Sequence, residues 1–114
     1  MQTGRSLVKL AIILLTTAPL ASCGFFAELT AMRTFKDANL NYGRAAYEDA
    51  IEEYEEVITV LEDGAEGELS QMMTAAYFYI ANSYDNLYKP ALQGDADNDA
   101  FLEHAAEFYR LGAE

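Results

Sequence analysis

The residues best suited to bind a metal ion lie near the end of this 114-residue chain. His104 is the sole histidine, and Glu103 and Glu107 fall close to it on one expected helix. A carboxylate and an imidazole can bind a transition metal together, but three ligands from one solvated helix make a weak site. We therefore interpret His104 as a surface or interface residue and predict no metal ligand there.

An alternation of aspartates suggests a second kind of metal chemistry. Asp95, Asp97 and Asp99 have the spacing of the first ligands in a calcium-binding loop. The pattern then fails, because Ala100 replaces the turn glycine and Ala106 replaces the closing bidentate glutamate. We expect a solvated loop whose last residue, Asp99, caps the following helix, with calcium binding as the alternative.

Residue combinations typical of catalysis are missing from the sequence. It contains no glycine-rich phosphate loop, no Ser-His-Asp set and no zinc-ligand spacing. The carboxylates between Glu48 and Glu56 are expected to face water, where no apolar wall would shift their pKa values. The sequence therefore predicts neither an enzyme nor a cofactor.

The composition favours a helical, strongly acidic domain. Hydrophobic residues make up 52% of the chain, which is enough for a core, and only 2 prolines interrupt it. The β-branched residues are scattered rather than grouped in alternating runs, so helix is favoured over sheet. With 19 acidic and 7 basic residues the net charge is −12, which argues against nucleic acid as a partner. It also argues against attachment of the whole domain to anionic lipid by basic residues.

The first 22 residues have the order of a secretory signal peptide. Arg5 and Lys9 precede an apolar block over residues 10–15, and small residues follow it. The only cysteine, Cys23, comes directly afterwards, so it cannot form an internal disulfide. An uncleaved transmembrane helix over residues 10–27 is the alternative, because 18 residues without charge just reach the spanning length.

The segment Leu20-Ala21-Ser22-Cys23 resembles the lipobox of bacterial lipoproteins. The resemblance implies cleavage between Ser22 and Cys23 and acylation of Cys23, so that residues 1–22 are the signal peptide and 23–114 the mature domain. Gly24 follows the cysteine where aspartate usually retains a lipoprotein at the inner membrane. The resemblance therefore implies export to the cell envelope, with the outer membrane facing the periplasm favoured in a two-membrane source.

Apolar spacing predicts four helices after the cysteine. The first covers about 27–42 and is ended by Gly43, and the second follows an apolar stripe from Tyr47 to Leu61. A third runs from an N-cap at Ser70 to about residue 88, and the fourth begins near Asp99 or residue 100. The third is apolar on more than one face, so we expect other helices to cover it from two sides.

Helices two to four resemble the hairpins of tetratricopeptide repeats over about residues 35–112. The resemblance implies an all-α fold of antiparallel hairpins stacked as a short solenoid, although the spacing from Ala50 to Ala105 exceeds the usual period. A half-apolar last helix suggests a domain truncated at its C-terminus or completed by a partner, and a generic four-helix bundle is the alternative. The residues that carry the pattern are Tyr47, Ala50, Tyr54, Val57, Tyr77, Ile80, Ala81, Tyr84, Ala105 and Tyr109.

The resemblance implies a lipid-anchored scaffold or adaptor of the cell envelope. Its hairpins would bind a protein or peptide partner, for which Tyr79 and Tyr88 are the candidate contacts because tyrosine combines a large apolar area with a polar tip. Two alternatives stay open. One is a structural bundle that associates with its own copies, and the other is a lipoprotein that binds a solute or metal.

Overall fold

The computed structural model describes residues 24–114, which are helical apart from their loops and turns. The predicted signal peptide, the lipobox with Ser22 and Cys23, and most of the alternative transmembrane segment lie outside the described residues. The chain divides into two compact units, Met1–Thr30 and Ala31–Glu114. In the first unit the described residues, 24–30, are helical and exposed.

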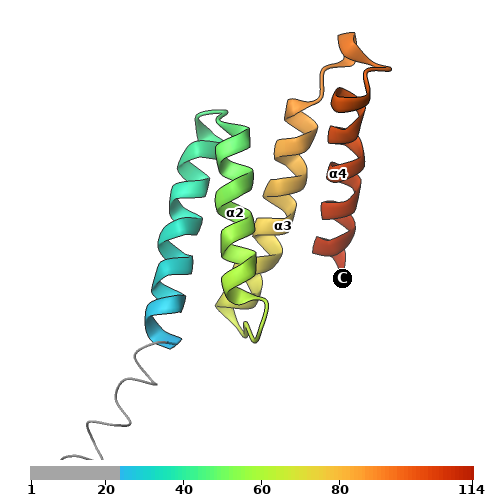
Figure 1. Cartoon of the computed structure of the whole chain (residues 1–114). Helices are drawn as coiled ribbons and strands as arrows, with labels where there is room; N and C mark the ends of the chain where they lie inside the picture. The colour runs from blue at the N-terminus through green and yellow to red at the C-terminus, as the bar shows by residue number, and fades with distance from the viewer. Residues whose placement is uncertain (1–23) are drawn as a thin grey trace, which may run out of the picture. The chain divides into compact units, whose positions relative to one another are not determined.

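Helical hairpins make up the second unit. The first helix covers residues 24–43 and continues into this unit, where α2 (Tyr47–Leu61), α3 (Glu68–Leu87), the short 3-10 helix η1 (Pro90–Leu92) and α4 (Ala96–Ala113) follow it. Successive helices of the second unit run antiparallel (Figure 1). For the described part of the chain, the prediction of an all-α fold with four helices packed as hairpins is confirmed.

The predicted N-cap of α3 is wrong. The helix begins at Glu68, two residues before Ser70, and Gly67 occupies the cap position with a φ of +59°. Such a left-handed conformation costs glycine little, so the chain can enter the helix directly after it. Ser70 lies inside the first turns instead, where its carbonyl accepts a hydrogen bond from the Thr74 hydroxyl at 3.1 Å.

The predicted start of α4 is also wrong, by about one turn. Asp95 is the N-cap, and its carboxylate accepts a hydrogen bond from the backbone N–H of Asn98 at 3.0 Å. Asp99, which was predicted to be the cap, lies within the helix and accepts from the backbone N–H of Gly94 at 3.1 Å. Acidic residues in a first turn also interact favourably with the positive end of the helix dipole, which stabilises this earlier start.

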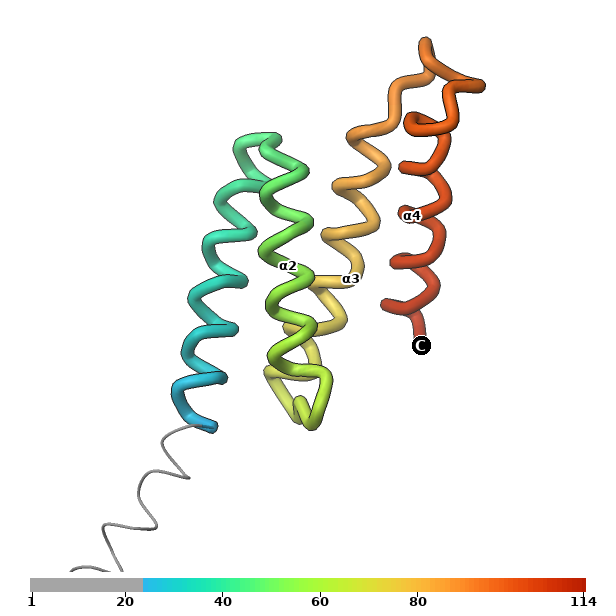
Figure 2. The backbone as a smooth tube through the Cα atoms, in the orientation of Figure 1, coloured from blue at the N-terminus to red at the C-terminus, as the bar shows by residue number. Residues whose placement is uncertain are grey.

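Figure 2 shows the chain reversing in a tight turn between the first helix and α2. The residue with left-handed backbone in this turn is Ala45 rather than Gly43. Gly43 is the last helical residue, and Ala45 has a φ of +61°. The backbone N–H of Ala46 donates to the carbonyl of Asn41 at 2.9 Å, and that of Ala45 donates to Tyr42 at 3.0 Å. These two bonds form a Schellman motif, whose left-handed position is usually glycine.

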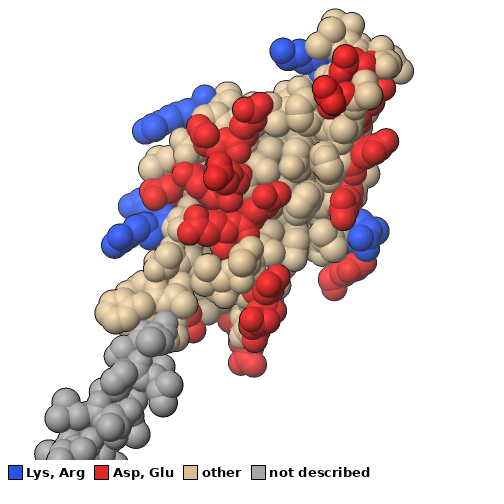
Figure 3. Space-filling model, in the orientation of Figure 1, with Lys and Arg blue, Asp and Glu red and all other residues tan. Residues whose placement is uncertain are grey.

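Charge is distributed unevenly over the helices. The helix α2 carries six acidic and no basic residues, and Figure 3 shows acidic side chains crowded over the middle of the face in view, with Lys and Arg toward its margins. Between residues 24 and 114 the only ion pair joins Arg110 to Glu114. Most of the acidic side chains are therefore solvated rather than neutralised by a neighbouring cation.

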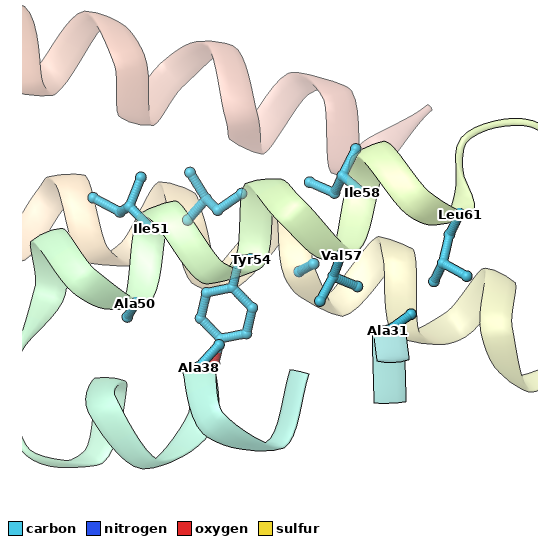
Figure 4. Close-up of a cluster of buried hydrophobic side chains, with 10 residues drawn as sticks. Ala31, Ala38, Ala50, Ile51, Tyr54, Val57, Ile58 and Leu61 are labelled. Atoms are coloured by element: carbon cyan, nitrogen blue, oxygen red, sulfur yellow. The ribbon is translucent and has the colours of Figure 1, made fainter. Parts of the chain in front are cut away.

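Small residues in the core bring the helices close together. Ala38 of the first helix and Ala50 of α2 are completely buried, and Figure 4 shows both beside the ring of Tyr54. At Gly112 of α4 an added Cβ would lie 3.2 Å from the Cβ of Tyr77, so α4 also approaches α3 closely. Larger side chains fill the space around these contacts. The buried hydrophobic residues are Ala31, Ala38, Ala50, Ile51, Tyr54, Val57, Ile58, Leu61, Ala76, Ile80, Ala81 and Ala105.

Two substitutions at the first turn should both stabilise the protein. Ala45→Gly removes a left-handed alanine that costs about 1–2 kcal/mol, partly offset by the flexibility of glycine in the unfolded chain. Gly43→Ala adds a methyl group that meets nothing within 4 Å and gains up to about 1 kcal/mol of helix propensity. Each variant should raise the midpoint of urea unfolding followed by circular dichroism. Destabilisation by Gly43→Ala would instead support the sequence-based prediction that Gly43 is the terminating residue.

Candidate functional site

Aromatic rings from three helices meet on one side of α3. The ring of Tyr79 stacks on Tyr54 of α2, with centroids 5.4 Å apart and planes at 11°. The ring of Tyr42, from the first helix, meets Tyr79 edge-on at 5.0 Å. We call Tyr42, Tyr54, Tyr79, Asn82 and Tyr109 the Tyr–Asn cluster, because the last two residues continue it toward α4.

Hydrogen bonds link this cluster from the first helix to α4. The Tyr42 hydroxyl donates to the side-chain oxygen of Asn82, which also accepts from the Asn86 amide at 2.9 Å. The Asn82 amide donates to the Tyr109 hydroxyl over a long 3.4 Å, and that hydroxyl donates to Asp85 at 2.9 Å. Bonds between residues up to 40 positions apart fix the helices relative to one another.

Burial in the cluster favours neutral tyrosine hydroxyls. It raises the pKa of Tyr54 far above the usual 10.0, and the neighbouring Tyr79 adds to the effect. The pKa values of Tyr42 and Tyr109 are raised as well, with burial again the largest cause. A hydroxyl that stays protonated can donate a hydrogen bond, as Tyr54 does to the side-chain oxygen of Asn39.

Two successive residues of α3, Phe78 and Tyr79, are exposed beside the cluster, and we call them the aromatic patch. Tyr79 belongs to the cluster, and the Phe78 ring lies 6.2 Å from the ring of Tyr109. Phe78 is 43% and Tyr79 37% exposed, although both are large side chains. The exposed side chains of Asp85 and Asn86 lie about two turns further along the same helix. The patch therefore combines exposed rings with nearby groups that donate and accept hydrogen bonds, which is the composition of a recognition surface.

Another side of α3 packs against α4 through aromatic rings. Tyr84 lies 5.0 Å from the imidazole of His104 and about 6 Å from the rings of Phe101 and Phe108. His104 is exposed at this helix interface. No group of three or more His, Cys, Asp or Glu residues between 24 and 114 is arranged to hold a metal ion. The Asp95 and Asp99 carboxylates, considered above for calcium, instead accept backbone hydrogen bonds.

The residues of the predicted repeat pattern lie in the interior or at its margin. Ala50, Tyr54, Val57, Ile80, Ala81 and Ala105 are buried, while Tyr47, Tyr77, Tyr84 and Tyr109 are half-buried. The two predicted partner contacts are separated. Tyr79 belongs to the aromatic patch, whereas Tyr88 follows the end of α3, is half-buried and has no aromatic neighbour among residues 24–114.

Asn98 is a structural residue that sequence reasoning missed. It is almost completely buried, and its side-chain oxygen accepts from the backbone N–H of Lys89 at 2.8 Å while its amide donates to the Lys89 carbonyl at 2.9 Å. The side-chain oxygen thus takes the place of a backbone acceptor for the Lys89 N–H where the chain leaves α3, while the Lys89 carbonyl also accepts from the backbone N–H of Leu92 at 2.9 Å. Asn98 also lines an open hollow of about 260 Å³ with Lys89 and Phe101. The only available signal was an amide three residues after a capping aspartate.

Comparison of the chain with known proteins finds no matching family model, no matching curated protein and no matching solved structure. Among residues 24–114, no helix combines the length and the apolar character that crossing a bilayer requires.

The raised pKa of Tyr54 predicts a loss of stability in alkali. Because the folded pKa lies above the unfolded value of 10.0, the stabilisation is complete below about pH 10 and is lost as pH rises toward the folded pKa. Tyr54→Phe should cost about 0.5–1.5 kcal/mol at neutral pH through its lost hydrogen bond. It should also make the decline above pH 10 shallower. Denaturant unfolding at a series of pH values tests both effects.

The matched control is Tyr47→Phe, which removes a half-buried hydroxyl from the same helix. If the stability curves of wild type and Tyr54→Phe ran parallel from neutral pH into alkali, the proposed role of Tyr54 burial would be wrong.

Proposed function

We propose that the protein is a lipid-anchored scaffold of the bacterial cell envelope that binds a protein or peptide partner on its helical hairpins. The observation that carries the proposal is the aromatic patch of Phe78 and Tyr79, which is large, apolar and partly exposed. Isolated exposed apolar residues are common, but here the Tyr79 ring stacks on Tyr54 and the Phe78 ring packs at a tilt against Tyr109. Both rings are therefore held in place before any partner arrives. Little side-chain entropy would be lost on binding.

The polar groups beside the patch suit a peptide segment. An extended peptide exposes backbone donors and acceptors along its length. Asn86 and Asp85, both exposed on α3, provide amide and carboxylate groups within reach of the patch. The resemblance of residues 35–112 to tetratricopeptide repeats supports the same class of function, because stacked hairpins in that family bind peptides and proteins.

The lipobox resemblance supports the anchor. In the unit that contains the described residues 24–30, Phe25 and Phe26 are exposed, and only Gly24 separates them from Cys23. Aromatic side chains of this kind partition well into the interface between water and lipid headgroups. Two or three acyl chains on one cysteine would make the attachment effectively permanent, whereas one chain gives only marginal binding.

The anchor is tested by the intact mass of the protein purified from membranes. We expect the mass of residues 23–114 plus two or three fatty acyl groups and glycerol, and we expect Cys23→Ala to retain residues 1–22 without acyl groups. Cys23→Ser is a second variant, in which a hydroxyl replaces the thiol at the same position. Retention of the first 22 residues in the wild-type protein, without added lipid, would contradict the anchor proposal.

Partner binding is tested by photocrosslinking in cells. A photoreactive phenylalanine analogue at Phe78 should give an adduct of one defined mass, because a partner would cover the aromatic patch. The same analogue at Val60 is the matched control, since Val60 is an exposed apolar residue of α2. Equal adducts at both positions, or none at Phe78, would count against the proposal. A dimer-sized adduct at Phe78 would identify a second copy of the chain as the occupant.

A further inference from the structure

The outward side of the first helix is not covered by the rest of the second unit. Ala31 and Ala38 are buried, and they mark the side of this helix that packs against the core. Met32, Lys36 and Leu40 repeat at steps of four, so they lie along a different side of the same helix. Met32 is 48% and Leu40 50% exposed.

Basic residues accompany these exposed apolar side chains. Arg33 and Lys36 are exposed on the helix, and Arg44 follows directly after its end. Within residues 24–114 none of the three forms an ion pair, because the single pair there involves Arg110. We call Met32, Arg33, Lys36, Leu40 and Arg44 the basic face.

The basic face contrasts with the remainder of the second unit. Residues 31–44 contain three basic residues and one acidic residue, a formal charge of +2, whereas residues 45–114 contain two basic and 17 acidic residues, a charge of −15. In Figure 3, Lys and Arg side chains line the margin on the side of the first helix, away from the acidic middle of the view. The unit therefore has a pronounced separation of charge.

We propose that the basic face lies against an anionic lipid surface and orients the domain there. The inference rests on the proposed lipid anchor, which supplies the affinity, so that the basic face only has to select an orientation. Met32 and Leu40 would enter the headgroup boundary, and the long stems of Arg33 and Lys36 would reach across apolar surface to the phosphates. Exposed basic residues beside apolar ones are the composition of helices that lie in the membrane interface.

The acidic body does not cancel this attraction. Electrostatic interactions in water are screened over about 8–10 Å at physiological ionic strength. A helix with its side chains is about 10–12 Å in diameter. Most acidic groups on α2 and beyond would therefore stand about one screening length or more from the lipid when the basic face is down. Glu53 lies nearer, because its carboxylate accepts from the Asn41 amide of the first helix at 2.9 and 3.0 Å. The −12 net charge of the whole chain is thus compatible with a local contact of opposite sign.

The test is a collision-accessibility measurement on spin-labelled, lipidated protein. Leu40→Cys introduces the only free thiol, since Cys23 is acylated in this form. The full chain is produced in a lipidating bacterium, purified from membranes and reconstituted into vesicles of equal parts phosphatidylcholine and phosphatidylglycerol. We expect a several-fold lower collision rate of the label with a water-soluble nickel complex than for the control, and a higher rate with oxygen. Leu102→Cys is the matched control, because Leu102 is 42% exposed on α4.

A charge-reversed variant distinguishes orientation from nonspecific contact. Arg33→Glu with Lys36→Glu, in the Leu40→Cys background, should return the nickel collision rate at position 40 to that of the Leu102 control. Vesicles of phosphatidylcholine alone should give weaker protection of position 40 in the parent protein. Circular dichroism checks that the reversed variant keeps its helices.

The outcomes separate this inference from the anchor proposal. If the protein floats with the vesicles and carries acyl groups, but positions 40 and 102 are equally open to nickel, the orientation is wrong and the anchor stands. The same conclusion follows if charge reversal leaves position 40 protected. If the protein neither floats nor carries acyl groups, the anchor and the orientation both fail.

Discussion

Close contact between helices at alanine and glycine is the constraint on which the rest of the structure depends. Ala38 and Ala50 are completely buried, and Gly112 leaves no room for a methyl group against Tyr77 without movement. Small residues let the helix backbones approach, and the larger side chains then interlock around the contact as ridges enter grooves. Tyr54 can be buried whole only because alanines stand beside it.

Helix interiors were predictable from the sequence, whereas the starts of α3 and α4 were not. The apolar stripe of α2 gave its bounds correctly, because one side of that helix is buried along its whole length and periodicity reports burial directly. The starts of α3 and α4 were misplaced because several residues could cap each of them. Gly67 competes with Ser70, and Asp95 competes with Asp99, so composition alone cannot choose between them.

The candidate site was predictable only in part, because the partners of its polar residues are distant in sequence. Tyrosines at helical spacing were expected in the core, and Tyr54 and Tyr84 do pack there or at its margin. Asn82 and Asn98 were missed because a polar residue in a helix usually faces water. Their partners are distant in sequence, since Asn82 bonds to Tyr42 and Tyr109, and no local pattern predicts such pairings.

The net charge of the chain does not describe how charge is distributed over its surface. A count treats all positions as equal, whereas solvent screening makes the nearest charges decisive. The first helix carries Arg33 and Lys36 on its exposed surface while the acidic residues concentrate beyond position 47. Composition argues against contact of the whole domain with anionic lipid, and within the described residues the acidic excess lies in α2, α3, α4 and the loops between them.

The proposed lipid contact and the proposed partner site lie on elements that are rigidly joined. Tyr42, near the end of the first helix, meets Tyr79 edge-on and bonds to Asn82, so the first helix is fixed to the part of α3 that carries the aromatic patch. The Tyr42 ring contacts Tyr79 while its hydroxyl bonds to the Asn82 side chain. Two contacts made at once by one residue resist independent rotation of the two helices. An orientation imposed on the first helix by a membrane would therefore also set the direction in which Phe78 and Tyr79 face. A scaffold built this way needs no hinge to present its binding surface at a constant angle to the bilayer.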